Sequence, residues 1–280
     1  MEIRRELSDT AFLVNESRAR CVEVGRDTLA RHWVPPARRA AVRALWEDFA
    51  REVYPHDALQ LGLRNRFFLE RIARVAAEPR GVLLNVAAGM TSYPYLVEPP
   101  LPAIEVDQEH VLELKRERSA ALRARGVLPE RRVELFAADL NDPVDQQRLN
   151  VLCARELPRR RSIAVLEGIS YYLPPATFER LIGLLAAAQT PGSILALDFW
   201  EPQNAAHPVF VRLAAFFRAR FGVAPESYRF LEPAELESLE GYDLVELADV
   251  AALERAYCAS RVLADPESIL PERYAVLARR

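Results

Sequence analysis

From residue 81 onward, short apolar runs alternate with segments whose apolar residues recur at helical spacing. The runs are GVLLNVAAG (81–89), PAIEVD (102–107), RVELFAADL (132–140), SIAVLEG (162–168) and SILALDFW (193–200). Each is largely apolar over the length of a strand, as expected for strands buried on both faces. Residues 108–126 and 174–192 read as the helices between them. This alternation predicts an α/β fold, with a largely parallel sheet and helices on both of its faces.

The chain before residue 79 and the chain after residue 200 depart from this alternation. Residues 1–78 read as helical, with apolar faces formed by Ala41, Leu45, Phe49 and Val53 and by Phe67, Phe68, Ile72 and Val75. We therefore expect an N-terminal helical cap over 1–78 and a Rossmann-like domain over 79–280. An aromatic helix and loop within 201–235 are expected to lie over the site as a lid. Residues 242–250 and 272–280 are the final predicted strands, and the last of them can run antiparallel.

Composition excludes several classes of function. The chain has 280 residues and a formal net charge of −3, which argues against a protein that binds nucleic acid by neutralising phosphates. No apolar run approaches the roughly 20 residues of a membrane helix, and MEIRRELSDTAF lacks the apolar stretch of a secretory signal. We expect a cytoplasmic protein. Its 3 cysteines and 4 histidines show no metal-ligand spacing, so no metal site is predicted.

Candidate binding residues stand at the ends of the first four predicted strands. In a doubly wound sheet the ligand lies beyond the carboxyl ends of the strands, where the strand order reverses. These ends carry Ala87 to Gly89, Asp107, Asp139 with Leu140, and Glu167. An acid about 20 residues after a small-residue turn can accept bonds from ribose hydroxyls. Alternatively, Asp107 and Asp139 cap the helices that follow them.

The turn after the first strand distinguishes between two nucleotide-like cofactors. A nicotinamide enzyme needs a glycine-rich turn that presents backbone N–H groups to a pyrophosphate. Here the turn reads AAGMTS, without the GxGxxG spacing. S-adenosylmethionine (SAM) has no phosphate, so this turn favours SAM as the cofactor.

Five segments, in order, resemble the leucine carboxyl methyltransferase family: LRNRFF, NVAAGM, IEVDQ, AADL and LEGISYYL. That family includes protein phosphatase carboxyl methyltransferases and bacterial O-methyltransferases of polyketide pathways. The resemblance implies a class I methyltransferase fold and a set of SAM-binding residues. In that set Arg64 holds the SAM carboxylate with Arg66 nearby, Ala87 and Gly89 flank the methionine part, Asp107 binds the ribose, Asp139 and Leu140 hold the adenine, and Glu167 lies by the amino group. Without the resemblance, Arg64 could equally be a surface arginine of a helix.

The sequence departs from the family pattern at the cofactor turn and near the N-terminus. Ala87 replaces the first glycine of the family's GAG, and an alanine adopts positive φ only at a cost. Thr91-Ser92 stands where the family has Asp-Thr. Asn15 occupies the place of a lysine found in eukaryotic members, and Arg18 can compensate for it.

These observations predict a SAM-dependent O-methyltransferase that acts on a small molecule, with an apolar carboxylate as the favoured acceptor. A carboxylate is already ionised and needs no general base, whereas a hydroxyl acceptor would need one. His207, Tyr171 and Tyr172 are the candidate bases. The alternative is a methyltransferase-like protein that has lost catalysis and serves as a binding or scaffold module. A GxSxG hydrolase elbow is rejected because position 172 is tyrosine. The sequence specifies no oligomeric state.

Overall fold

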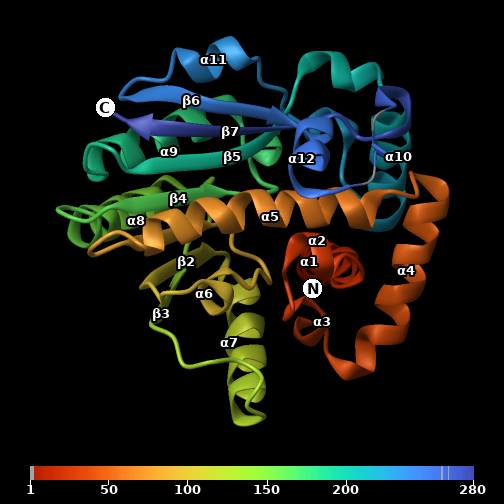
Figure 1. Cartoon of the computed structure of the whole chain (residues 1–280), viewed down its shortest axis with the longest axis horizontal. Coiled ribbons are helices and arrows are strands. Elements are labelled where there is room, and N and C mark those ends of the chain that lie inside the picture. The colour runs from red at the N-terminus through yellow and green to blue at the C-terminus, as the bar shows by residue number, and fades with distance from the viewer. Residues whose placement is uncertain (1–2, 260, 264) are drawn as a thin grey trace.

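The fold is built on one sheet of seven strands in the order β3-β2-β1-β4-β5-β7-β6 (Figure 1). The computed structural model describes residues 3–259, 261–263 and 265–280, with side chains from residue 10 onward. The strands are β1 (Val82–Val86), β2 (Ala103–Asp107), β3 (Val133–Ala137), β4 (Ser162–Leu166), β5 (Ile194–Trp200), β6 (Tyr242–Asp249) and β7 (Glu272–Arg279). Every strand predicted from the hydrophobic pattern is confirmed.

Helices occupy the connections and the N-terminal region. The α-helices are α1 (Ile3–Arg20), α2 (Val22–Gly25), α3 (Ala30–Trp33), α4 (Arg39–Glu52), α5 (Asp57–Ala76), α6 (Tyr93–Leu96), α7 (Glu109–Ala124), α8 (Pro143–Glu156), α9 (Pro175–Ala188), α10 (Pro208–Phe221), α11 (Pro233–Glu237) and α12 (Val250–Tyr257). Short 3-10 turns are η1 (Pro36–Arg38), η2 (Ser170–Tyr172), η3 (Pro202–Ala206), η4 (Pro225–Ser227) and η5 (Pro266–Ser268). Among the described residues, no helix combines the length and the apolar character that crossing a bilayer requires.

Strand direction fixes where a ligand can bind. β1 to β5 pair in parallel, and β7 lies between β5 and β6, antiparallel to both. The α/β prediction and the antiparallel last strand are therefore confirmed. The chain reverses its direction of strand addition between β1 and β4, and a crevice opens at such a point beyond the carboxyl ends of the strands.

Alternate residues along the central strands pack into two separate hydrophobic cores, one on each face of the sheet. Leu84, Ile104 and Ala164 belong to the core shared with α8 and α9 on one face of the sheet. Leu83 and Ile163 belong to the core shared with α5 and α12 on the other face. This period of two is what strands buried on both faces require.

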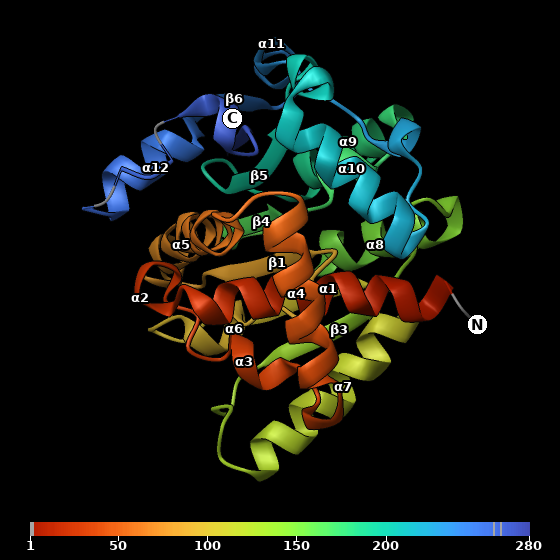
Figure 2. The ribbon, with the colours of Figure 1, turned by 90° about the vertical axis from the view of Figure 1, so that its right-hand side faces the viewer.

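The N-terminal helices lie over the carboxyl edge of the sheet. Figure 2 shows α1, α4 and α10 in front of the strand ends, while α5 runs along the sheet and contacts β1 and β4. The expected boundary between the helical cap and the Rossmann-like domain lies at residue 78. It therefore assigns α5 to the cap, although α5 packs against the sheet. One predicted apolar face needs correction, because Ala41 is exposed and Val42 takes its place in the interior beside Phe49.

The turn after β1 holds an alanine in the left-handed region. Ala87 has φ of 55° and Gly89 has φ of 47°. Ala88 between them is fully buried, and its N–H donates to the carbonyl of Val106 on the neighbouring strand. The left-handed conformation costs a residue with a Cβ about 1–2 kcal/mol. The chain thus keeps the backbone shape of a glycine turn while it carries alanine at the first position.

We predict that Ala87→Gly stabilises the protein by up to about 1 kcal/mol, because glycine removes the strain but adds freedom to the unfolded chain. Ala88→Gly is the matched control and should destabilise by about 1 kcal/mol, since position 88 gains no relief and loses a buried methyl. Urea unfolding of the two variants measures both effects. A loss of stability in Ala87→Gly would show that the turn is not strained.

One lysine is buried in the interior of the protein. Lys115, the only lysine of the chain, is fully buried on α7, and its Nζ lies 2.7 Å from Oε1 of Glu105 in the middle of β2. Asn85 Nδ2 also donates to Oε1 of Glu105, at 3.3 Å. Burial raises the pKa of Glu105, and the ammonium of Lys115 opposes that shift. The pair ties α7 to the sheet, although its net contribution to stability is small once desolvation is included.

We predict that Lys115→Met costs about 3–5 kcal/mol, because Glu105 is left buried without its cation. The double variant Glu105→Leu/Lys115→Met should recover most of that loss, since no charge then remains to be buried. Chemical denaturation of the single and double variants gives both values. Equal losses in the two would mean that side-chain packing, and not charge, dominates at this position.

Candidate functional site

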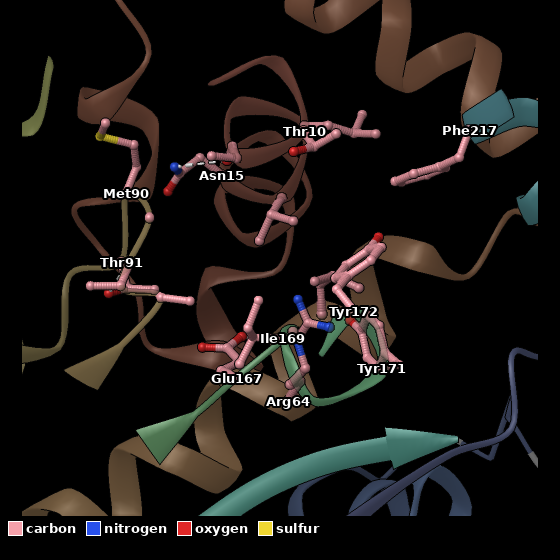
Figure 3. A pocket seen from close by; sticks show the side chains of 18 of the residues that line it. Thr10, Asn15, Arg64, Met90, Thr91, Glu167, Ile169, Tyr171, Tyr172 and Phe217 are labelled. Carbon is pink, nitrogen blue, oxygen red and sulfur yellow. Dashed lines mark hydrogen bonds and ion pairs between the residues drawn. The ribbon is translucent and has the colours of Figure 1, made fainter. Parts of the chain in front are cut away.

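A cavity of about 450 Å³ opens at the carboxyl ends of β1, β2, β3 and β4. Its walls come from those strand ends, from α1 and α5, and from α10 (Figure 3). The lining includes Asn15, Arg18, Arg64, Ala87, Gly89, Asp107, Asp139, Leu140, Glu167, Tyr171 and Tyr172. Segments far apart in the sequence thus meet at the crevice that the strand order creates.

Asp107 organises the turn after β1. The N–H of Gly89 donates to its Oδ2 at 2.7 Å, and the N–H of Gln108 donates to its Oδ1 at 2.8 Å. Burial raises the pKa of Asp107, and these two backbone donors act against that shift. Gln108 is the N-cap residue of α7, so Asp107 is not the helix cap that was its alternative reading. Each carboxylate oxygen can accept a second bond, which leaves Asp107 free to bind a hydroxyl in the cavity.

Asp139 and Leu140 line the neighbouring wall beyond β3. Oδ1 of Asp139 accepts from the N–H of Asn141 at 2.9 Å. The cap of α8 is Asp142, whose Oδ1 accepts from the N–H of Val144 at 2.7 Å. Asp139 therefore also stands outside the capping position. Its carboxylate and the buried side chain of Leu140 present an acceptor next to an apolar surface.

Glu167 is the centre of a buried ionic cluster at the end of β4. Its Oε1 lies 2.8 Å from Nε of Arg64 and also pairs with Arg18, while the hydroxyl of Tyr93 donates to Oε2 at 2.6 Å. Burial acts to raise the pKa of Glu167, but Arg18 and Arg64 outweigh it and the pKa lies below its usual value. Glu167 is therefore ionised at neutral pH.

Arg64 joins that cluster to two strands further along the sheet. Its Nη1 lies 3.4 Å from Oδ2 of Asp198 on β5 and 3.2 Å from Oε1 of Glu272 on β7. Asp198 also accepts from the N–H of Gly168 at 2.7 Å. Burial and the nearby charge of Glu272 raise the pKa of Asp198 well above its usual value. The guanidinium is thus shared among several carboxylates, and it still faces the cavity.

The opposite end of the cavity is aromatic. Tyr171 stacks on Trp200 with ring centroids 3.9 Å apart and an interplanar angle of 7°. Phe49 of α4 and Leu213 and Phe217 of α10 complete this end, so the segment predicted as a lid contributes to the lining. Such a surface suits a flat or apolar molecule and excludes water from the ionic cluster beside it.

Two of the predicted site residues lie elsewhere. Arg66 is absent from the lining, since its Nε pairs with Glu70 at 2.6 Å on another side of α5. His207 caps α10, where its Nδ1 accepts from the N–H of Val209 at 3.2 Å, and its Nε2 lies 2.8 Å from the carbonyl of Pro266. The expectations that Arg66 binds the cofactor near Arg64 and that His207 is a candidate base need correction, because neither residue lines the cavity.

Sequence reasoning missed several polar residues of the site: Tyr54, Asp57, Gln60, Asp198 and Glu272. Asp57, Gln60 and Leu61 share the cavity-lining face of α5 with Arg64, at the i, i+3, i+4 and i+7 spacing of a helix. That spacing could have identified them. Glu272 carries no such local signal. It reaches the site because the antiparallel β7 begins at the sheet edge where the parallel strands end, and it pairs with Trp200.

Comparisons with known proteins identify relatives of this chain. A protein of Mycobacterium avium named "Putative S-adenosyl-L-methionine-dependent methyltransferase" is 32% identical over 177 residues, which cover 56% of either chain. A protein of Mycobacterium tuberculosis with the same name is 29% identical over 212 residues, covering 68% of this chain and 65% of that one. The chain therefore spans little more than half the length of the first of these relatives.

Solved structures share the fold. A DUF574 family protein of Streptomyces avermitilis superposes with a TM-score of 0.62 at 20% identity, over 95% of this chain and 97% of that one. A "putative methyltransferase" of Thermobifida fusca gives 0.58 at 19% identity, over 86% and 88%. The expected class I methyltransferase fold is confirmed. A sequence model of the leucine carboxyl methyltransferase family matches residues 10–186. Since that match covers more than half of the sequence and includes most of the cavity lining, the chain belongs to the leucine carboxyl methyltransferase family.

Proposed function

We propose that this protein is a SAM-dependent O-methyltransferase that acts on a small molecule. The observation that carries the proposal is a single cavity in which Arg64, Asp107, Asp139 and Glu167 line one part and aromatic side chains line the other. Family membership supports the same activity. The polar part has groups for each portion of SAM, and the aromatic part leaves space for an acceptor.

The chemistry of the donor set fits SAM. Asp107 has lone pairs for ribose hydroxyls, and Asp139 with Leu140 offers an acceptor and an apolar face to the adenine. Arg64 and Arg18 provide positive charge for the carboxylate, and ionised Glu167 provides negative charge for the amino group. When bound, SAM supplies a methyl group on a positively charged sulfur.

The protein contributes to the reaction by positioning the acceptor against the cofactor and by excluding water. Leu213 and Phe217 of α10, opposite Tyr171, would hold an acceptor against the cofactor, and we propose that residues 201–235 act as a lid. Holding two reactants in alignment can remove about 7–11 kcal/mol from the barrier. This mechanism places no demand on a catalytic histidine or cysteine.

The charge of the cavity favours a hydroxyl over a carboxylate as the methylated oxygen. Asp57 and Glu272 line the acceptor part and would repel an anionic acceptor. Burial raises the pKa of Tyr171 and Tyr172 well above the usual tyrosine value, so both stay protonated and neither is a base at neutral pH. A hydroxyl acceptor would lose its proton to one of the two carboxylates.

The alternative of a non-catalytic scaffold rested on the altered first turn. That turn nevertheless adopts positive φ at both Ala87 and Gly89, and it keeps its bond to Asp107. The backbone shape expected of a glycine turn is therefore retained. No feature of the cavity favours the scaffold over the enzyme.

Calorimetric titration with SAM tests the proposal. Asp107→Ala should weaken SAM binding by about 1–3 kcal/mol, because a buried charge-assisted hydrogen bond to the ribose is lost. Asp142→Ala is the matched control: it removes the cap of α8, should cost about 1 kcal/mol of stability, and should leave SAM affinity unchanged. Absence of SAM binding by the native protein would refute the proposed activity. Equal affinity in Asp107→Ala and the native protein would refute the ribose role of Asp107.

A further inference from the structure

The acceptor side of the cavity carries more negative than positive charge. Asp57 and Glu272 line it, and both side chains are buried. Glu272 shares Arg64 with Glu167 and Asp198, so one guanidinium faces several carboxylates. Buried carboxylates without matching cations are costly. A positively charged group in the cavity would therefore be stabilised.

Asp57 is the carboxylate whose charge is least compensated. The hydroxyl of Ser17 donates to its Oδ2 at 2.5 Å and the indole N–H of Trp46 donates at 3.2 Å, and both donors are neutral. Among the described residues, no arginine or lysine forms an ion pair with it. Asp57 is the first residue of α5, where the helix dipole favours an anion. Burial raises the pKa of Asp57, and the bonds from Ser17 and Trp46 and the more distant charge of Arg64 act against that shift.

Protonation of Asp198 and the positive charge of bound SAM do not fully compensate the negative charge on the acceptor side of the cavity. The pKa of Asp198 is raised well above its usual value, so that carboxyl can be neutral. Bound SAM adds a net single positive charge through its sulfonium, its ammonium and its carboxylate, and that charge lies beside Glu167 and Arg64 in the proposed pose. Asp57 lies seven residues before Arg64 on α5, about 10 Å along the helix axis. In the proposed pose the charge of SAM is therefore not in direct contact with Asp57.

The surroundings of Asp57 also suit an organic cation. Tyr54 donates to Oε1 of Gln60 at 2.8 Å, and Nε2 of Gln60 lies 3.5 Å from Oε2 of Glu272, so these three side chains form one polar wall. Asp57 lies three residues before Gln60 on α5 and lines the same cavity. Phe49, Tyr54 and Trp200 line the cavity near that wall. Aromatic faces beside carboxylates are the surroundings in which proteins bind ammonium groups.

We infer that the methyl acceptor carries a protonated amine and that Asp57 binds it, with Glu272 as the second carboxylate of the subsite. This inference rests on the proposed function, since it names the class of acceptor for the same cavity. The ammonium is an anchor that donates hydrogen bonds to Asp57, while Glu272 takes the proton of the hydroxyl that is methylated elsewhere on the acceptor. The subsite would select amine-bearing molecules against neutral and anionic molecules of equal size.

A series of three phenols tests this selectivity. Tyramine, 4-propylphenol and 3-(4-hydroxyphenyl)propionate share the phenol and the two-carbon spacer, and they end in an ammonium, a methyl and a carboxylate. Each is titrated by calorimetry at millimolar concentration into the full chain saturated with S-adenosylhomocysteine. Tyramine should bind at least about tenfold more tightly than 4-propylphenol, and the carboxylate should bind most weakly. No binding of tyramine, equal binding of tyramine and 4-propylphenol, or strongest binding of the carboxylate would overturn the inference.

Variants test whether Asp57 causes the preference for tyramine over 4-propylphenol. Asp57→Asn keeps an acceptor for Ser17 but removes the charge, so tyramine affinity should fall about tenfold while 4-propylphenol affinity is unchanged. Glu113→Gln, on an exposed part of α7, removes the same net charge far from the subsite and should change neither. Unchanged tyramine affinity in folded Asp57→Asn would overturn the role of Asp57.

The binding of S-adenosylhomocysteine separates a failure of the proposed function from a failure of the amine subsite. If the native protein does not bind S-adenosylhomocysteine, the proposed function fails before any acceptor is tested. If it binds S-adenosylhomocysteine and the phenols rank in another order, the methyltransferase proposal stands and only the amine subsite is refuted.

Discussion

The shared guanidinium of Arg64 is the interaction on which the site depends. One side chain from α5 contacts Glu167 after β4, Asp198 on β5 and Glu272 on β7. These contacts hold the helix against the carboxyl edge of the sheet and bring acidic side chains from three parts of the sheet together around one crevice. Removing a single partner from such a cluster leaves buried charge behind, so the members constrain one another.

This arrangement separates the cavity into two chemical regions. Around Asp107 the protein offers carboxylate oxygens and backbone groups to a polar ligand. Around Tyr171 and Trp200 it offers stacked rings and apolar side chains from α10. Asp57 and Glu272 are the exceptions, because they place carboxylates within the aromatic part. The proposed selectivity of the acceptor region for charge as well as for shape depends on these two acids.

Much of the fold was predictable because buried parallel strands leave a strong pattern in sequence. The strand ends carry the candidate residues, and Asp107, Asp139 and Glu167 do meet in one cavity. Helix α8 was not predicted, although Asp142 followed by proline is a helix start signal. The acidic acceptor wall was missed for a different reason. Glu272 is brought to the site by strand order, which depends on long-range pairing and not on any local pattern.

The buried lysine has a practical consequence for handling the protein. Since Lys115 is the only lysine and has no exposure to solvent, the folded surface presents no ε-amino group to acylating reagents, aldehyde fixatives or amine-reactive dyes. Those reagents would reach position 115 only when α7 separates from the sheet. Modification of this single amine would therefore serve as a built-in reporter of local opening, read directly by mass spectrometry.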